Sequence, residues 1–158
     1  MGLFKRGDAG ARAEIMAEKL RDGLQGALGP NEEIKGVCIA TQTGMVKGRM
    51  VAVGVTEDRL LLQPMTRKWE PDGRAAVLTG SQIASAQIDG GGGLSSSLAA
   101  VIMDGTTVTL KLKTVDGETW KLMMMKGTGV LGGFGGGEVQ KQGLEALAEW
   151  FSRADNAL

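Results

Sequence analysis

Four basic residues are the first candidates for chemistry in this sequence. Lys47 and Arg49, separated by one glycine, lie in a predicted turn between two strands, and Arg67 and Lys68 lie in a later connection. Two cations that project from a hairpin loop can hold a phosphate group through charge-assisted hydrogen bonds. We expect the second loop to bring its two cations alongside the first. The alternative is that all four are ordinary solvated charges of turns.

The sequence lacks the residue patterns of catalytic and metal sites. It has no histidine and one cysteine, Cys38, which lies inside an apolar run. This removes the usual ligands of zinc and copper and the usual general base near neutral pH, and it excludes hydrolase triads and metalloproteases. Glu57 and Asp58 belong to a tight turn, with no partner carboxylate at a useful spacing. We expect no catalytic residue, no metal and no cofactor, and we interpret Cys38 as a small buried hydrophobe.

Composition narrows the class of protein further. The 158 residues carry 18 basic and 18 acidic side chains, so no whole-molecule field attracts nucleic acid or anionic lipid. The length corresponds to one domain. The longest apolar run is much shorter than the roughly 20 residues that span a bilayer, and residues 1–10 lack the hydrophobic segment of a secretory signal. A single cysteine suits a reducing compartment. We predict a cytoplasmic protein that binds no nucleic acid and begins with a flexible tail over residues 1–10.

Residues 98–125 contain three runs of alternating apolar and polar residues, joined by two Asp-Gly pairs. A two-residue Asp-Gly link is a strong hairpin signal, because both central residues of that turn need a positive φ. Alternation places Leu110, Leu112, Trp120 and Leu122 on the buried face and Lys111 and Lys113 on the solvated face. The pattern predicts a three-stranded antiparallel meander with strands at 98–104, 106–114 and 118–125.

Four further segments with a period of two precede the meander. In the second of them three valines share one face, and the opposite face is more varied. The fourth alternates poorly, so that a bulge is needed to bury both Ile83 and Ile88. Residues 66–80 are expected to form an exposed connection or a short hairpin. The predicted strands are 32–43, 48–55, 59–64 and 81–88.

Two segments have helical spacing of apolar residues. The first, residues 11–29, contains Gly23 and Gly26, which lower its intrinsic stability by roughly 1 kcal/mol each relative to alanine, so it must be held by packing. The second, residues 138–154, has an apolar stripe with Trp150 at its border. An amphipathic helix needs a partner surface, and we expect the second helix to cover the open end of the sheet.

The arrangement resembles a bacterial pleckstrin-homology-like (PH-like) domain. The segment LGPNEEI (28–34) is similar to the start of the first strand in such domains, VGVTEDRLLLQP (53–64) is similar to one of their hairpins, and Trp150 stands where PH domains carry a tryptophan. The resemblance covers residues 30–154. It implies a mainly β fold with flanking helices, in which seven antiparallel strands form a partly open barrel of two near-orthogonal sheets. The C-terminal helix would close this barrel. The helix 11–29 lies outside the pattern, and is either an oligomer contact or a brace for the barrel.

The resemblance implies binding and no enzymatic activity. The first expectation is a scaffold or adaptor that binds a protein partner, or copies of itself, through exposed sheet edges and the N-terminal helix. The alternative is a peripheral membrane module that binds anionic phospholipid, because in lipid-binding PH domains a Lys-x-Arg element between the first two strands coordinates inositol phosphates. Lys47 and Arg49 occupy that place. A third interpretation, an enzyme or a small-ligand barrel, predicts a deep polar pocket.

Four apolar residues are candidates for an interface. Leu131 and Phe134 lie in the glycine-rich stretch 127–137, and they either contact a membrane or partner or fold back onto the barrel. Met123 and Met125 point outward at the end of the last strand, where they form a sticky edge or an interface with the N-terminal helix. We favour packing or self-association over copper binding for these methionines.

Overall fold

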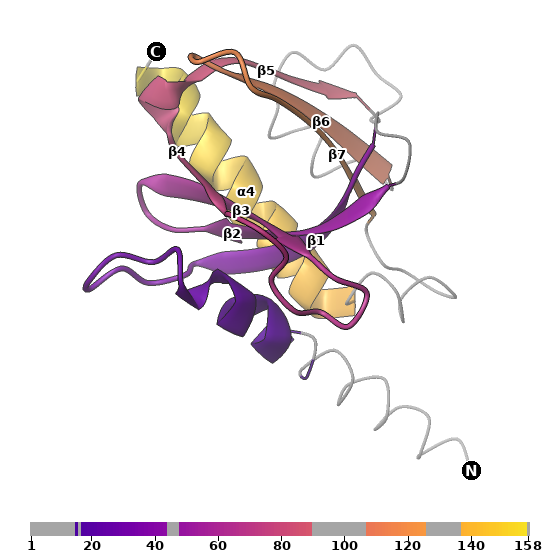
Figure 1. The fold of residues 1–158 in the computed structure, drawn as a ribbon. Coiled ribbons are helices and arrows are strands. Elements are labelled where there is room, and N and C mark those ends of the chain that lie inside the picture. Colours follow the sequence, from indigo (N-terminus) through magenta and orange to yellow (C-terminus); the bar gives the residue numbers. More distant parts are fainter. Residues whose placement is uncertain (1–14, 16, 44–47, 90–106, 126–136, 158) are drawn as a thin grey trace.

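The computed structural model describes residues 15, 17–43, 48–89, 107–125 and 137–157 of the chain (Figure 1). Seven antiparallel strands follow one another in the sheet order β4-β3-β2-β1-β7-β6-β5. The sheet curls into a near-closed barrel, and the C-terminal helix packs on β1. The elements are β1 (Gly36–Gln42), β2 (Arg49–Val55), β3 (Arg59–Met65), β4 (Ala76–Thr79), the short 3₁₀ helix η1 (Gly80–Gln82), β5 (Ile83–Asp89), β6 (Thr107–Thr114), β7 (Thr119–Met125) and α4 (Gly137–Ala157).

Strand β1 joins the two halves of the barrel. It pairs with β2 over its whole length, from Gly36 opposite Val55 to Gln42 opposite Arg49. With β7 it pairs only at its end, where Thr41 and Gln42 are opposite Met123 and Leu122. The seven-stranded sheet therefore divides at this short junction into two parts, which we call the first sheet (β1–β4) and the second sheet (β5–β7). The expected PH-like, mainly β fold with flanking helices is confirmed.

The β6–β7 hairpin forms where it was predicted, but its turn differs. Thr114 donates its N–H to the Glu118 carbonyl (2.8 Å), which leaves the three residues 115–117 in the loop. In this loop the residue with positive φ is Gly117, at 94°. The prediction of a two-residue Asp-Gly turn is wrong for a physical reason. A loop of two residues would place Leu112 opposite Lys121, whereas three residues place it opposite Trp120 and keep the apolar side chains on one face.

Strands β4 and β5 can be compared with the strands and the connection predicted from the sequence. Strand β4 shows that residues 66–80 end in a hairpin arm, which pairs with β3. Strand β5 lies beside β6, and its register shifts between Ile83 and Ser85, which confirms the predicted bulge. The expected strand 98–104, with its Asp-Gly link, and the expected tail over residues 1–10 lie outside the described residues.

The barrel interior is one apolar core to which both sheets and α4 contribute. Leu60, Leu110, Leu122 and Leu144 are among its fully buried members. Trp150 is also buried and meets Phe151 edge to face, with ring centroids 5.1 Å apart. The expectation that the tryptophan-bearing helix closes the barrel is confirmed.

Helix α4 is attached to β1 by an amide and a glycine. Gln140 accepts the Ile39 N–H at Oε1 (2.8 Å) and donates from Nε2 to the Ile39 carbonyl (2.9 Å). These are the two bonds that a neighbouring strand would make, and β7 pairs with β1 only further along. A Cβ atom at Gly143 would stand 1.9 Å from the Val37 carbonyl oxygen, so only glycine permits this close approach.

The N-terminal helix, residues 17–25, covers the outer face of the first sheet (Figure 1). Leu20 and Leu24 are buried there in a second apolar cluster, together with Ala52 and Leu61. A Cβ atom at Gly54 would lie 2.7 Å from a methyl carbon of Leu24. Of the two roles considered for this helix, the structure supports the brace, because its apolar stripe is buried against its own chain.

Candidate functional site

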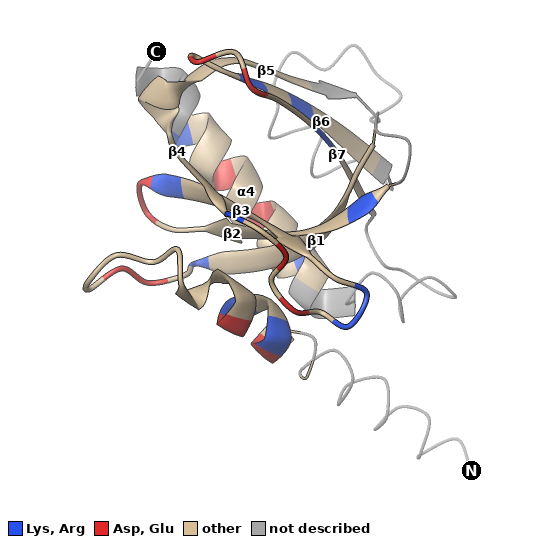
Figure 2. Cartoon of the chain, viewed as in Figure 1, with Lys and Arg blue, Asp and Glu red and all other residues tan. Residues whose placement is uncertain are grey.

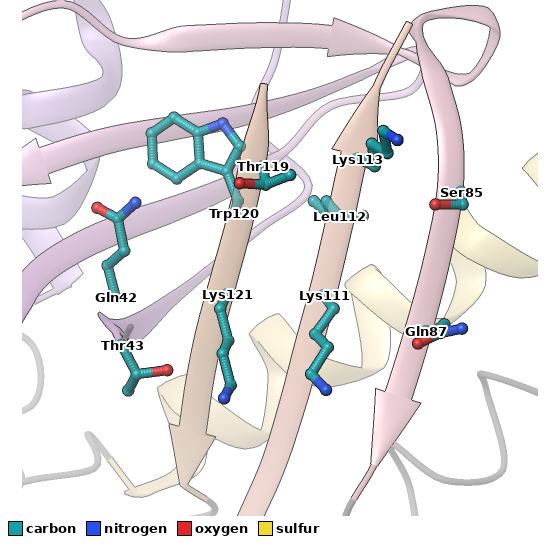
Figure 3. Close-up of a pocket in the computed structure, with 10 residues that line it drawn as sticks. All are labelled: Gln42, Thr43, Ser85, Gln87, Lys111, Leu112, Lys113, Thr119, Trp120 and Lys121. Carbon is teal, nitrogen blue, oxygen red and sulfur yellow. The ribbon is translucent and has the colours of Figure 1, made fainter. Parts of the chain in front are cut away.

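A hollow of about 460 Å³ lies on the outer face of the second sheet, next to the end of β1 (Figure 3). Three lysines dominate its lining, and hydroxyl and amide groups surround them. We call the outward side chains of this hollow the lysine face: Thr43, Ser85, Gln87, Lys111, Lys113, Thr119 and Lys121.

The strand register explains why these side chains meet. Lys111 is the direct cross-strand partner of both Lys121 on β7 and Gln87 on β5. Thr43 continues this row, because it donates its N–H to the Lys121 carbonyl (2.9 Å). The next row contains Lys113 opposite Thr119. In Figure 3 the side chains of Lys111 and Lys121 run in the same direction from neighbouring strands.

The apolar side chains of the same strands hold the lysines outward. Leu110, Leu112 and Leu122 are at most 2 % exposed, and alternation sends the residues between them to solvent. Like charges directly opposite one another on a sheet are destabilising. Lys111 and Lys121 form such a pair of like charges on neighbouring strands. Lys111 also takes part in an interaction within the chain.

The described lining of the hollow contains no carboxylate, and Figure 2 shows basic residues along β6 and β7. Two buried polar atoms of the lining, Thr43 Oγ1 and Trp120 Nε1, lack a hydrogen-bond partner among the described residues. Glu118 directly precedes the lining residue Thr119, and nearby Asp116 is engaged in the β6–β7 turn. The Thr114 hydroxyl donates to its carboxylate and lowers the pKa of Asp116. The lysine face is thus a basic, polar surface on the paired strands β5, β6 and β7.

The predicted phosphate-binding residues are placed as follows. Arg49 donates from Nε and from a guanidinium NH₂ group to Gln42 Oε1, at 3.2 and 2.9 Å. Lys47 lies outside the described residues. Gln42 is nearly buried and also lines the hollow, so Arg49 stands at its border.

Arg67 and Lys68 lie in an exposed turn after β3. Thr66 Oγ1 accepts the N–H groups of Lys68 (3.3 Å) and Glu70 (3.2 Å), and Trp69 packs against the second apolar cluster on the outer face of the first sheet. Arg49, in contrast, shares the inner face of its strand with the core valines. The strand pairing brings the start of this loop next to Arg49, since Met65 is opposite Met50, and the packing of Trp69 joins the loop to the outer face of the first sheet.

The predicted interface residues are only partly described. Met123 is half-buried on the outer face, opposite Thr41 and Thr109. Met124 is fully buried, with its sulfur 3.9 Å from that of Cys38. The side chain of Met125 and the residues Leu131 and Phe134 lie outside the described part of the chain.

The most perturbed carboxylate belongs to a structural ion pair. The Arg59 guanidinium binds Glu32 through both carboxylate oxygens, and this contact lowers the pKa of Glu32 to about 2. Thr56 Oγ1 also donates to this carboxylate (3.1 Å), and Arg59 donates to the Ala27 carbonyl (3.3 Å). The pair thus ties the end of the N-terminal helix to the β2–β3 turn. It joins the two sequence segments on which the PH-like resemblance depends.

A second hollow, of about 530 Å³, lies between α4 and the first sheet. Its charges are mixed: Lys35 and Arg153 stand with Glu57, Glu145 and Glu149. Among the described residues there is no group of three or more side chains suited to a metal ion. The balance of charge gives this hollow no preference for one sign of ligand.

Sequence reasoning placed Lys111 and Lys113 on a solvated face but did not combine them with Lys121. The three lysines could have been grouped from the sequence if the strand register across the β6–β7 loop had been predicted correctly. A three-residue loop pairs Lys111 with Lys121, whereas a two-residue loop separates them.

Within the described residues, no helix has the length and apolar character needed to cross a membrane.

No protein-family model matches the chain, and no curated protein matches it. Among solved structures it is similar to the hSac2 domain from the human phosphoinositide phosphatase Sac2. That match has 11% identity and a TM-score of 0.51, and it covers 91% of this chain and 82% of the other. Another similar structure is the C-terminal domain of an unknown protein from Leishmania infantum, with 10% identity, a TM-score of 0.42, and 66% and 80% of the two chains covered. The likeness to the hSac2 domain, a PH-like fold, concerns the fold alone.

Proposed function

We propose that this chain is a non-enzymatic PH-like module that binds a protein partner through its lysine face. The supporting observation is the contrast between the two outer faces of the barrel. The outer face of the first sheet is covered by the chain's own helix, and the lysine face is lined by exposed lysines around a hollow. A polar sheet face with concentrated charge of one sign favours recognition by electrostatic complementarity.

The lack of histidine and the burial of the only cysteine agree with a binding role without catalysis. The chain contains no histidine. Its only cysteine, Cys38, is fully buried, and burial raises the pKa of this thiol to about 12. A thiol of that pKa is not ionised at neutral pH and is a poor nucleophile.

The charge of the lysine face favours a different protein over a second copy of this chain. In a two-fold symmetric dimer the same patch lies on both sides of the interface. Pairing of two lysine faces would place Lys113 and Lys121 against their own counterparts, which costs electrostatic energy. We therefore expect light scattering to give the mass of a monomer at low salt.

Site-specific photo-crosslinking tests the proposal. A photoreactive amino acid is placed at Ser85 or Thr119 on the lysine face, and at the exposed Gln142 on α4 as the matched control. In cells of the source organism, we expect a discrete crosslinked protein from the first two positions only. That protein, once purified, should bind the wild-type chain and bind the Lys113→Glu, Lys121→Glu variant at least tenfold more weakly. Equal crosslinking from all three positions, or unchanged affinity of the variant, contradicts the proposal.

Vesicles separate this function from the membrane alternative, in which Lys47 and Arg49 bind anionic phospholipid. Vesicles that contain phosphatidylserine are sedimented with the wild-type chain and with the Lys47→Ala, Arg49→Ala variant. We expect no sedimentation of either protein at 0.15 M salt. Sedimentation that requires Lys47 and Arg49 would establish the membrane alternative in place of the protein partner.

A further inference from the structure

The spacing of the three lysines defines what the lysine face can bind. Lys111 and Lys113 are two residues apart on one strand, which corresponds to about 6.6–6.8 Å. Lys121 is directly opposite Lys111, and such pairs have Cβ atoms about 4.5–5.5 Å apart. The distance between Lys111 and Lys113 therefore equals the distance between side chains two residues apart in any other extended peptide.

The backbone of the second sheet contributes little to anion binding. Strand β6 is paired on both sides, with β5 and with β7, so its N–H groups are used in the sheet. Compact phosphate sites typically combine several free backbone N–H groups or a helix N-terminus with their cations. The described lining also contains no arginine, the side chain that binds phosphate through two parallel hydrogen bonds. The charge is therefore spread along the face and does not converge on one point.

The groups between the lysines suit a polypeptide. Ser85 and Gln87 on β5 and Thr119 on β7 border the lysines in the same two rows, and they offer hydrogen-bond donors and acceptors. The hollow of about 460 Å³ lies within the range of small-ligand sites, about 300–1,000 Å³. A few side chains of a segment laid along β6 would fill it.

From this geometry we infer that the lysine face binds an acidic, extended segment of the partner, with carboxylates on alternate residues along β6. The inference rests on the proposed function and adds the chemical class of the partner. Two carboxylates two residues apart meet Lys111 and Lys113, and the one at Lys111 also meets Lys121, which lies directly opposite Lys111.

Two synthetic peptides of equal charge provide the test. One is acetyl-Ser-Glu-Ser-Glu-Ser-Glu-Ser-amide, with alternating glutamates, and the other is acetyl-Ser-Ser-Glu-Glu-Glu-Ser-Ser-amide. Both are titrated into the full chain by calorimetry at 20 mM salt, where exposed charges are weakly screened. We expect the alternating peptide to bind about threefold to fivefold more tightly than the block peptide, and its affinity to fall at 0.3 M salt. Equal affinities for the two peptides overturn the inference.

Variants connect the binding to the lysine face. Because Lys111 has an interaction within the chain, the variants use the other two lysines. Lys113→Gln and Lys121→Gln should each weaken the alternating peptide about threefold, and the double variant about tenfold. Lys141→Gln on the exposed side of α4 is the matched control and should leave the affinity unchanged. Full affinity in the double variant, with a circular dichroism spectrum like that of the wild type, overturns the inference.

Two further probes separate the inference from other ligands and from the proposed function. Inorganic tripolyphosphate that binds more tightly than the alternating peptide would identify a phosphate site and overturn the inference. The proposed function has its own test, and it is contradicted if photoreactive residues at Ser85 and Thr119 give no crosslink. If they give the crosslink but the purified partner presents no acidic segment to the lysine face, the function stands and the inference is overturned.

Discussion

The two outer faces of this barrel are built by the same alternation but are used differently. On the first sheet most outward positions are small or apolar, such as Ala52 and Gly54, and they receive Leu20 and Leu24 of the N-terminal helix. On the second sheet most outward positions are polar, and lysine, threonine, serine and glutamine side chains line a hollow there. An outward face with small residues can accept a helix, whereas a face with long charged side chains stays solvated and is available for a charged partner.

The comparison also separates stability from binding. Leu24 is fully buried on the first sheet, so the chain loses folding free energy when its contacts are removed. The lysines of the second sheet are exposed, and exposed charges contribute little to folding. We therefore expect substitutions on the first outer face to change stability, and substitutions on the second to change binding.

The largest effect is expected on the covered face. Leu24→Ala should lower the free energy of unfolding by about 2–4 kcal/mol, because it removes buried methyl groups and leaves a cavity against Gly54. Urea denaturation measures this value. The matched substitution on the other face, Lys113→Ala, should change it by less than about 0.5 kcal/mol. Equal losses for the two variants would show that the N-terminal helix is not a brace.

The next effect concerns α4, which is attached to β1. Gly143→Ala should destabilise the chain by about 2–3 kcal/mol, because the added Cβ atom would overlap the Val37 carbonyl and force the helix away from the strand. Gly26→Ala is the control, since a Cβ atom at Gly26 meets nothing within 4 Å. Thermal unfolding should show a lower Tm for the first variant only. An unchanged Tm for Gly143→Ala would contradict the close approach of helix and strand.

A smaller, pH-dependent effect is expected at the ion pair that holds the N-terminal helix. Arg59 lowers the pKa of Glu32 from 4.5 to about 2. The folded state therefore favours the ionised carboxylate, and this contribution is complete above pH 4.5 and is lost as the pH falls toward 2. Glu32→Gln should lose about 1–2 kcal/mol at pH 7, and less at pH 2. Urea titrations at both pH values measure the difference, and an equal loss at both would contradict the lowered pKa.

The smallest effect is expected on the lysine face, and it has the opposite sign. Lys121→Thr removes the like charge opposite Lys111, so it should raise the free energy of unfolding by about 0.2–0.5 kcal/mol at low salt. The gain should disappear in 1 M salt, where the repulsion is screened. A loss of stability at low salt would show that Lys121 stabilises the fold, and it would contradict this prediction.

Part of this structure could be predicted from particular residues. Leu110, Leu112, Trp120 and Leu122 were assigned to the buried face because a period of two is a local signal. Trp150 and the apolar stripe of α4 followed from helical spacing for the same reason. The hairpin loop was predicted with one residue too few. The Asp-Gly pair was taken as a two-residue turn, although only a three-residue loop places the apolar residues of the two flanking strands opposite one another. That error concealed the pairing of Lys111 with Lys121.

Other features depend on contacts between distant segments. The packing of Trp69 against the outer cluster joins the loop after β3 to the face that the N-terminal helix covers, and no local pattern encodes this contact. The close approach of Gly143 to Val37, and the use of Gln140 as a substitute for a strand, bring together residues about a hundred positions apart.

By itself, the sequence determined which side of each strand and helix is apolar, because side-chain periodicity depends only on neighbouring residues. The tertiary structure alone decided which strands are neighbours, which outer face the N-terminal helix covers, and which lysines lie together. These are choices among pairings of distant segments, and the free energy that decides among them arises only when the whole core is packed.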